Sequence, residues 1–303
     1  MEIENLVDVS IIIPCKNESN NLIKTIDSIM FSKNSFTFEI IVVDDGSTDL
    51  CTDFLKYTLI KNVYKNIHLI ETNSLGCSGA KNAGAKIARG KYLVFCDAHI
   101  KVQDGWLDSL VNTLKDQNAS LSAPSILYTK NFISGTYAYG ATWNKSLGYT
   151  WLLNNPNSIE EIPFAPATTL CITRECFNKI NGFDTFFIGY GVEDQELCLK
   201  SWLYGYKIVI NPNIKVKHLF KEKHSYKITN DCLIYNTLCL AYSHFKKDRL
   251  KKTITIFKKH KGFSVAANNI KSNIVEILRQ RDKYFTERIH SDDYFFKKFN
   301  IYF

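Results

Sequence analysis

The chain has 303 residues, 45% of them hydrophobic and 22% charged, with a formal net charge of +8. This length suits one large domain with a substantial core, or such a domain with an appendage. No apolar run reaches the roughly 18 residues of a membrane-spanning helix, and the acidic N-terminus, residues 1–4, lacks a signal-peptide pattern. Nine cysteines without a Cys-x-x-Cys pair are typical of thiols in a reducing compartment, so we expect a cytoplasmic protein.

The excess positive charge is concentrated near the C-terminus. Residues 245–261 contain eight Lys and Arg and one Asp, and Leu250, Ile254 and Phe257 recur there at helical spacing. This pattern predicts a basic amphipathic helix that either packs on the domain with its lysines in solvent or makes a peripheral contact with an anionic membrane or an acidic acceptor. No recognition motif supports nucleic-acid binding, and we expect no nucleic-acid partner.

The first half of the chain alternates predicted strands with predicted helices. Short apolar runs predict buried strands, and apolar residues at helical spacing predict the helices between them. The strands are expected at residues 9–13, 39–43, 67–70 and 92–96, and the helices at 18–31, 48–57, 79–88, 104–116 and 192–204. This order predicts an α/β fold with a mostly parallel sheet, and the pattern beyond Tyr226 is helical.

Polar side chains follow the predicted strands where each of them ends, and ligands bind at such ends in parallel sheets. Asp97 and His99 close the run 92–96, and residues two apart on a strand point to the same side. With the distant His218 they offer one carboxylate and two imidazoles, which suit Mn²⁺ or a similar divalent ion such as Mg²⁺. Such an ion could hold the diphosphate of a nucleotide-sugar as it leaves, although polar residues at a strand end also occur without any metal.

A second polar cluster, Gly189-Tyr190-Gly191-Val192-Glu193-Asp194, precedes a predicted helix. The two glycines permit tight turns, and the helix dipole favours ionised carboxylates at a helix start. An ionised carboxylate in a cleft can take the proton from an attacking hydroxyl. Ordinary placement of acidic residues at a helix N-terminus would explain the same pair without catalysis.

Residues 126–160 are rich in aromatic side chains and contain no acidic residue before Glu160. We expect either an irregular or β-ribbon excursion over the site, or a surface hairpin whose aromatic side chains pack on the body of the protein. In the first case Trp143 and Trp151, together with Tyr190, would contribute to an acceptor surface.

Several of these segments together resemble a known enzyme family. Residues 9–14, Asn17-Glu18 and residues 41–49 resemble the opening of family-2-type glycosyltransferases with the GT-A fold. Residues 79–84 fit the next motif of that family, with Lys81 where arginine is usual. The resemblance covers roughly residues 9–230, and the motifs occur in the family's order.

The metal motifs are similar to those of polypeptide N-acetylgalactosaminyltransferases. The similarity rests on Asp97-Ala98-His99, Trp202 and residues 218–226. Those relatives retain anomeric configuration and carry Glu-Asn where this chain has Glu193-Asp194, whereas inverting GT-A enzymes carry Glu-Asp with the aspartate as base. The resemblance therefore implies an inverting enzyme with Asp194 as base. A retaining polypeptide glycosyltransferase and a non-catalytic nucleotide-sugar-binding protein are the alternatives.

We therefore expect a metal-dependent GT-A glycosyltransferase domain at residues 1–225 and a helical basic extension at 226–303. It would move a hexose or N-acetylhexosamine from a UDP-sugar to a peptide, protein or glycan. Asp45 would accept a hydrogen bond from uracil N3–H, whereas Asp44 faces the other way. The expected residues are Pro14, Asn17, Glu18, Asp45, Gly76, Lys81, Asp97 and Ala98 for the nucleotide-sugar, Asp97, His99 and His218 for the metal, Glu193 and Asp194 for catalysis, and Trp143, Trp151 and Tyr190 for the acceptor.

Overall fold

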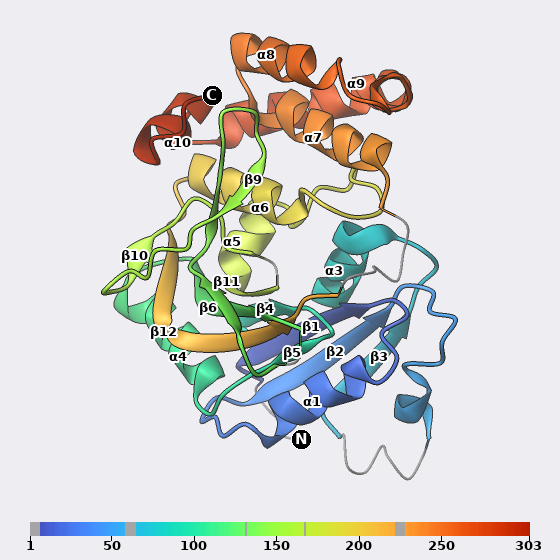
Figure 1. The fold of residues 1–303 in the computed structure, drawn as a ribbon, viewed down its shortest axis with the longest axis vertical. Coiled ribbons are helices and arrows are strands. Elements are labelled where there is room, and N and C mark those ends of the chain that lie inside the picture. Colours follow the sequence, from blue (N-terminus) through green and yellow to red (C-terminus); the bar gives the residue numbers. More distant parts are fainter. Residues whose placement is uncertain (1–6, 58–64, 131, 167, 222–227) are drawn as a thin grey trace, which may run out of the picture.

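The residues that the structure describes form a ten-stranded sheet at the centre of the molecule, with helices on both of its faces (Figure 1). The strand order is β10-β12-β6-β11-β4-β1-β2-β3, with β5 added to β12 and β7 added to β6. The computed structural model describes residues 7–57, 65–130, 132–166, 168–221 and 228–303.

The N-terminal half of the sheet is parallel, as the sequence predicted. Its strands are β1 (Val9–Cys15), β2 (Phe38–Asp44), β3 (Ile67–Glu71) and β4 (Tyr92–Cys96). Alternate side chains enter two separate cores: Ile12 and Ile41 belong to one, and Ile11 and Ile40 to the other. Because both faces are covered, these strands are continuous apolar runs without polar alternation.

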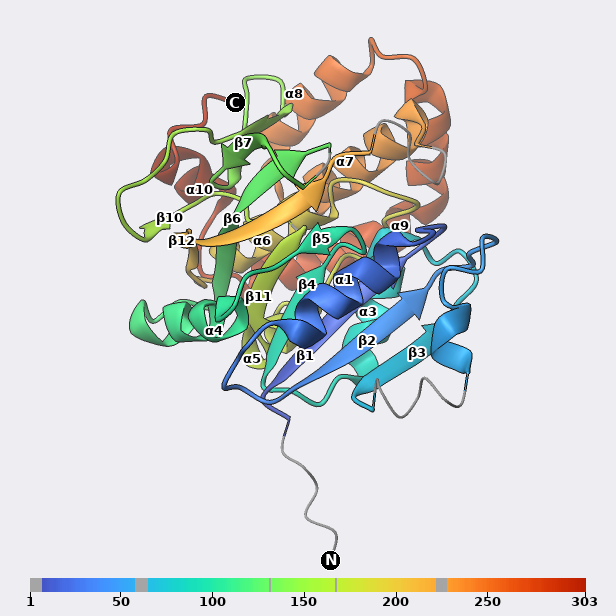
Figure 2. The same ribbon diagram turned by 60° about the horizontal axis from the view of Figure 1, so that its bottom comes forward.

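Helices cover the two faces in separate groups (Figure 2). One face carries α1 (Asn21–Phe31) and α4 (Trp106–Asp116), and the other carries α3 (Gly76–Ile87), α5 (Arg174–Lys179) and α6 (Glu193–Leu203). Helix α3 approaches the sheet closely, since a Cβ at Gly84 would lie 2.5 Å from Ile12 Cγ2. This contact explains the small residues of α3.

The second half of the sheet is mixed. Strand β11 (Thr169–Thr173) runs antiparallel between β4 and β6 (Leu121–Thr129), and β12 (Ile208–Leu219) is parallel to β6. The short strands β5 (Ile100–Lys101), β7 (Gly135–Ala138) and β10 (Glu160–Glu161) pair antiparallel with β12 or β6. Strands β8 (Ala141–Trp143) and β9 (Tyr149–Trp151) form a separate antiparallel pair within residues 126–160, a feature that does not distinguish the two interpretations of this segment.

The helix predicted at residues 48–57 was wrong: only a 3₁₀ helix, η1 (Asp53–Lys56), is present there. The preceding residues form a loop, because the carboxylate of Asp44 accepts hydrogen bonds from the Ser47 N–H and the Thr52 hydroxyl. Leu50 in this loop has φ of 60°, which is incompatible with a right-handed helix.

The C-terminal part is helical and packs against α6 (Figure 1). It comprises α7 (Asn230–His244), α8 (Lys247–Phe257), α9 (Phe263–Glu287) and α10 (Asp292–Lys298). Its buried residues, such as Phe245 and Ile277, join the same apolar core as Phe95 of β4. The domain boundary predicted at 225/226 lies outside the described residues.

Helix α8 is the basic amphipathic helix predicted for residues 245–261. Leu250, Ile254 and Phe257 pack against the core, whereas Lys251 and Lys252 are exposed. The apolar side of α8 therefore packs against the rest of the protein, as expected for a helix that packs on the domain with its lysines in solvent. Within the described part of the chain, no helix is both long and apolar enough to span a bilayer.

Candidate functional site

A cavity of about 480 Å³ lies at the carboxyl ends of β1, β2 and β4, where the sequence predicted a ligand site. Most of the residues selected from the sequence line it. They are Pro14, Glu18, Asp45, Gly76, Lys81, Asp97, Ala98, His99, Trp151, Tyr190, Glu193, Asp194 and His218.

One wall of the cavity brings the three expected metal ligands together. A ligand atom from each of Asp97, His99 and His218 lies within 4.8 Å of the others, and His218 Nε2 is 3.1 Å from Asp97 Oδ2. The pairing of β12 with β5 places His218 opposite Ile100, beside the Asp97–His99 turn. One carboxylate and two imidazoles at this spacing fit a divalent ion of the manganese type.

The charges around this cluster favour metal binding. Burial acts to raise the pKa of Asp97, but the hydrogen bond from His218 and the nearby His99 and Lys81 outweigh it and hold that pKa well below its usual range. Burial lowers the pKa of His218, despite the opposing effect of Asp97. Near neutral pH, the pair therefore offers an ionised carboxylate and a neutral imidazole, the forms that bind metals.

Glu18 holds His99 in place. Its carboxylate lies 3.1 Å from His99 Nδ1 and 2.6 Å from Lys221 Nζ, and its side chain is buried. A carboxylate on the second ring nitrogen of a histidine ligand fixes the ring orientation and raises its basicity. Glu18 therefore orients His99, one of the expected metal ligands, and its side chain does not cap α1, which begins at Asn21. Lys221 was missed by the sequence analysis, although it follows His218 closely.

Asp45 organises the edge expected to bind the nucleobase. Its carboxylate accepts hydrogen bonds from the Thr72 hydroxyl at 2.8 Å, the Leu75 N–H at 2.6 Å and the Gly76 N–H at 2.9 Å. Gly76 has φ of 77°, and a Cβ there would lie 2.9 Å from the Gly189 backbone. Asp44 faces away from Asp45, into the 46–52 loop, as predicted.

Asn17 does not line the cavity, contrary to expectation. Its Oδ1 accepts a hydrogen bond from the Thr48 N–H at 2.7 Å, and its own N–H donates to Ser47 Oγ at 3.0 Å. These bonds hold Asn17 against the loop after β2, with φ of 52°. Its contribution is to shape that loop.

The opposite wall carries Glu193 and Asp194 at the start of α6. Glu193 is buried: its Oε1 lies 3.2 Å from Lys81 Nζ, and its Oε2 accepts the Gly191 N–H at 2.8 Å. Lys81, expected among the nucleotide-sugar residues, is buried and pairs with this glutamate. Asp194 is half-buried, and its Oδ1 accepts the Gln195 N–H at 2.8 Å.

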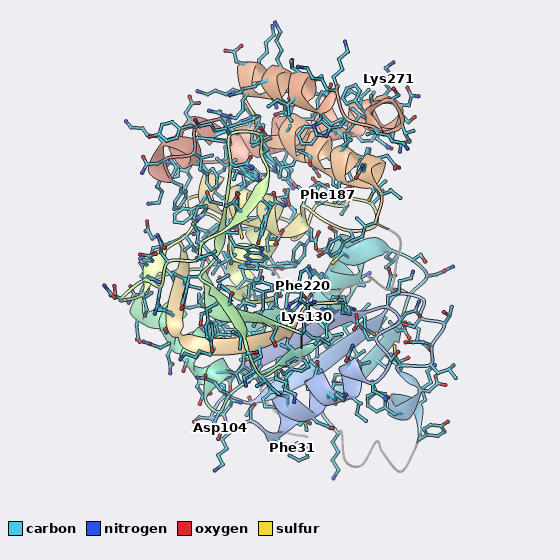
Figure 3. All side chains as sticks on the ribbon, in the orientation of Figure 1. Phe31, Asp104, Lys130, Phe187, Phe220 and Lys271 are labelled. Atoms are coloured by element: carbon cyan, nitrogen blue, oxygen red, sulfur yellow. The ribbon has the colours of Figure 1, made fainter. Side chains whose placement is uncertain are left out.

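Aromatic side chains form a third wall. Trp151 lies between Tyr128 and Tyr149, with ring centroids 4.5 and 4.8 Å away, and Tyr128 also contacts the His218 ring at 5.4 Å. Phe220, which is 56% exposed, lies between the N-terminal sheet and the C-terminal helices (Figure 3). Tyr128 and Tyr149 belong to the aromatic-rich residues 126–160 and line the cavity, but they were not among the expected site residues.

Trp143 is a core residue, so its assignment to the acceptor surface was wrong. Its indole N–H donates to Gln195 Oε1 at 2.6 Å, and its ring packs against Phe164, Phe245 and Phe296. Burial in the α6–α10 core leaves no surface for an acceptor.

The chain is similar in sequence to polypeptide N-acetylgalactosaminyltransferases. The chain is 32% identical over 238 residues to "Polypeptide N-acetylgalactosaminyltransferase 8" of Drosophila melanogaster, covering 72% of this chain and 39% of that protein. It is 28% identical over 256 residues to "Polypeptide N-acetylgalactosaminyltransferase 11" of Xenopus tropicalis, covering 77% of this chain and 42% of that protein. The chain thus spans well under half the length of these relatives.

The fold is also that of a solved glycosyltransferase. The structure titled "Crystal structure of GalNAc-T7 with UDP, GalNAc and Mn2+" superposes with a TM-score of 0.76 at 19% identity, covering 98% of this chain and 57% of that chain. This likeness confirms the predicted GT-A fold. A description of the "N-terminal domain of galactosyltransferase" matches residues 166–225. The description "Glycosyl transferase family 2" matches residues 10–176, more than half of the sequence, and the chain belongs to that family.

Proposed function

We propose that this chain transfers a hexose or N-acetylhexosamine from a UDP-sugar to a hydroxyl of a peptide, protein or glycan, in a metal-dependent reaction. The observation that carries the proposal is the position of Asp97, His99 and His218 on one wall of a single cavity that Glu193 and Asp194 line as well. This arrangement provides a site for a leaving diphosphate and a carboxylate for an attacking nucleophile within one cavity. The solved relative with UDP, GalNAc and Mn²⁺ supports the choice of donor and metal.

The donor would lie along the edge formed by β1, β2 and β4. Asp45 keeps the 72–76 loop in place and lines the cavity, where its carboxylate can also accept a hydrogen bond from uracil N3–H. A buried polar partner of this kind discriminates strongly among bases. Pro14 and Ala98 line the same cavity.

Asp97, His99 and His218 would hold Mn²⁺, or Mg²⁺ in its place. The ion supplies charge neutralisation for the departing diphosphate. Glu18 orients His99, and Lys221 balances the charge of Glu18. The roles of the protein side chains here are binding and orientation.

Asp194 would act as the general base and give inversion. Glu193 is engaged by Lys81 and the Gly191 N–H, so its proposed role is to position the start of α6. Asp194, which lines the cavity, is then the carboxylate that can take a proton from the acceptor hydroxyl. The names of the relatives favour a peptide acceptor. The resemblance to retaining polypeptide transferases keeps a retaining mechanism as the second candidate.

The acceptor would enter past Trp151, Tyr190 and Phe220. These aromatic side chains line the cavity, and Phe220 is largely exposed. A peripheral membrane contact through residues 245–261 and a cytoplasmic location stay predictions. Because the apolar side of α8 is packed inside the protein, such a contact would use the exposed lysines alone.

Thermal unfolding with nucleotide-sugars and MnCl₂ tests the donor, since a ligand of the native state raises its stability. UDP-GalNAc, UDP-GlcNAc and UDP-glucose are compared with GDP-mannose, and UDP release is then followed with candidate peptides. We expect at least one UDP-sugar to raise Tm with Mn²⁺ but not with EDTA, and Asp97→Ala to abolish the shift. No shift with any UDP-sugar would overturn the proposal.

A further inference from the structure

Residues 189–192 form a turn directly before α6 that contains a strained position. Val192 has φ of 75°, which a β-branched residue rarely adopts, and the two glycines of the turn have φ of 58° and 99°. Strained backbone persists only where the surrounding structure holds it, and such positions are concentrated at active sites. The turn carries Tyr190 and leads to Asp194, and both of these residues line the cavity.

A single side chain of α7 holds this turn through three hydrogen bonds. Helix α7 lies next to the segment that precedes α6 (Figure 1), and its residue Asn236 is 1% exposed. The Oδ1 atom of Asn236 accepts the Ile188 N–H at 3.0 Å. Its Nδ2 donates to the Ile188 carbonyl at 3.0 Å and to the Gly191 carbonyl at 2.9 Å. Because movement of the turn would leave buried polar groups unpaired, this amide fixes the turn in one geometry.

Two neighbouring residues of α7 also contact the turn. The Cys232 thiol donates to the Ile188 carbonyl at 3.0 Å. Leu233 packs so closely on Gly191 that a Cβ there would lie 2.5 Å from Leu233 Cδ2, and Leu233 itself lines the cavity. Helix α7 therefore forms part of the cavity wall, although the sequence predicted it to belong to a separate extension.

We infer that Asn236 is a positioning residue for the proposed transfer, which sets the place of Tyr190 and Asp194 by fixing the 189–192 turn. This inference rests on the proposed function and makes the C-terminal helices part of the active site. Glu193 holds the turn from the side of α3, through the Gly191 N–H and Lys81, and Asn236 holds it from the side of α7.

The position of the turn matters because a general base acts only within hydrogen-bonding reach of the proton that it takes. A displacement of a catalytic group by about 1 Å can lower the rate by about 100-fold. The metal cluster of Asp97, His99 and His218 lies on the opposite wall and has no hydrogen bond to Asn236 within the described residues. Loss of the Asn236 amide should therefore affect the transfer step and spare the metal.

Asn236→Leu tests this inference, because leucine is similar in size, suits a helix and removes all three hydrogen bonds. With the UDP-sugar and acceptor that the wild type uses best, kcat should fall by about 10- to 100-fold, while the Mn²⁺ affinity stays within about 2-fold. Asn273→Leu on α9 is the matched control and should change neither value. Asn273 is also a half-buried asparagine of the C-terminal helices, but its amide donates to Tyr235 Oη and the Asn269 carbonyl.

Hydrogen exchange with mass spectrometry measures the turn without any turnover. Peptides covering residues 186–194 should exchange faster in Asn236→Leu than in the wild type or in Asn273→Leu, because the Ile188 N–H loses its acceptor. Asn236→Asp is the second variant, for use where the leucine variant does not fold. It keeps the shape of the side chain and the acceptor oxygen but lacks both donated hydrogen bonds, so its kcat should also fall.

Four outcomes would overturn the inference. An unchanged kcat of the Asn236 variants would do so and leave the proposed function intact. Equal losses of kcat in Asn236→Leu and Asn273→Leu would show a role in stability alone. A fall in Mn²⁺ affinity that matches the fall in kcat would show a general disruption of the site. A wild type that releases no UDP from any UDP-sugar would overturn the proposed function as well.

Discussion

Lys81 and Glu193 form a buried ion pair, with 3.2 Å between Nζ and Oε1, although 112 positions separate them in the sequence. The pair joins α3 to the first residue of α6. Glu193 also accepts the N–H of Gly191, so the same carboxylate fixes the turn that presents Asp194 to the cavity. Lys81 is 1% and Glu193 5% exposed, so each buried charge is compensated mainly by the other.

Lys81→Met and Glu193→Gln should each destabilise the fold. Removing one partner leaves a buried charge uncompensated, which costs about 3–5 kcal/mol in the free energy of unfolding. The double variant should lose clearly less than the sum of the two single losses. Urea unfolding measures all three, with Lys86→Met on the exposed side of the same helix as the control. Strictly additive losses would show that the two charges do not stabilise each other.

Glu18→Gln should weaken Mn²⁺ binding by about 10- to 100-fold, the usual effect of removing a carboxylate behind a histidine ligand. The substitution keeps the shape of the side chain but removes the charge that orients His99 and pairs with Lys221. Electron paramagnetic resonance of free Mn²⁺ measures the affinity without any need for turnover. Glu160→Gln, an exposed change on β10, is the control. Equal Mn²⁺ affinities of the Glu18→Gln and Glu160→Gln variants would show that Glu18 does not contribute to metal binding.

The position of the site at the ends of the parallel strands, and its residues Asp97 and His99, could be predicted because they follow from short stretches of sequence. Buried parallel strands are continuous apolar runs, their ends share one edge, and Asp97 and His99 are two residues apart. No local pattern places His218 beside Asp97 and His99, since its proximity arises from the pairing of β12 with β5.

The remaining features depend on contacts between distant segments. Asn17 and Trp143 are residue types that suit a binding site, but Asn17 bonds to Thr48, and Trp143 packs against Phe245 and Phe296, which lie far later in the sequence. For the same reason, the residues near Lys81 in the sequence could not predict its partner, Glu193. A hydrogen-bonded loop replaced the predicted helix after β2, because the Asp44 side chain competes for the backbone N–H of Ser47.

Asp184 should make stability depend on pH. Burial, together with the charge of Glu196, raises the pKa of Asp184 to about 7, while the nearby Lys200 acts against this. The native state therefore binds this proton more tightly than the unfolded chain does. The resulting stabilisation is complete below about pH 4 and is lost as the pH rises to about 7.

Asp184→Asn removes this titration and keeps an acceptor oxygen for the Phe186 N–H, while its Nδ2 takes the place of the oxygen that accepts from the Gln280 amide. Relative to the wild type, the free energy of unfolding of the variant should rise between about pH 4 and pH 7 and then level off. Urea unfolding at several pH values measures the difference. Parallel curves for the two proteins would mean that Asp184 is ionised in the native state throughout this range.

Asp194→Asn distinguishes the two proposed mechanisms. If Asp194 is the base, the substitution should lower kcat by about 100- to 10,000-fold and leave the UDP-sugar affinity nearly unchanged, because a base acts in the transition state. The retaining polypeptide transferases that the sequence resembles carry asparagine at this place, so a retaining enzyme should tolerate the change. Proton NMR of the wild-type product gives the anomeric coupling constant, and an α-linked donor should yield a β-linked product. An α-linked product, or full activity of Asp194→Asn, would establish that Asp194 is not an inverting base.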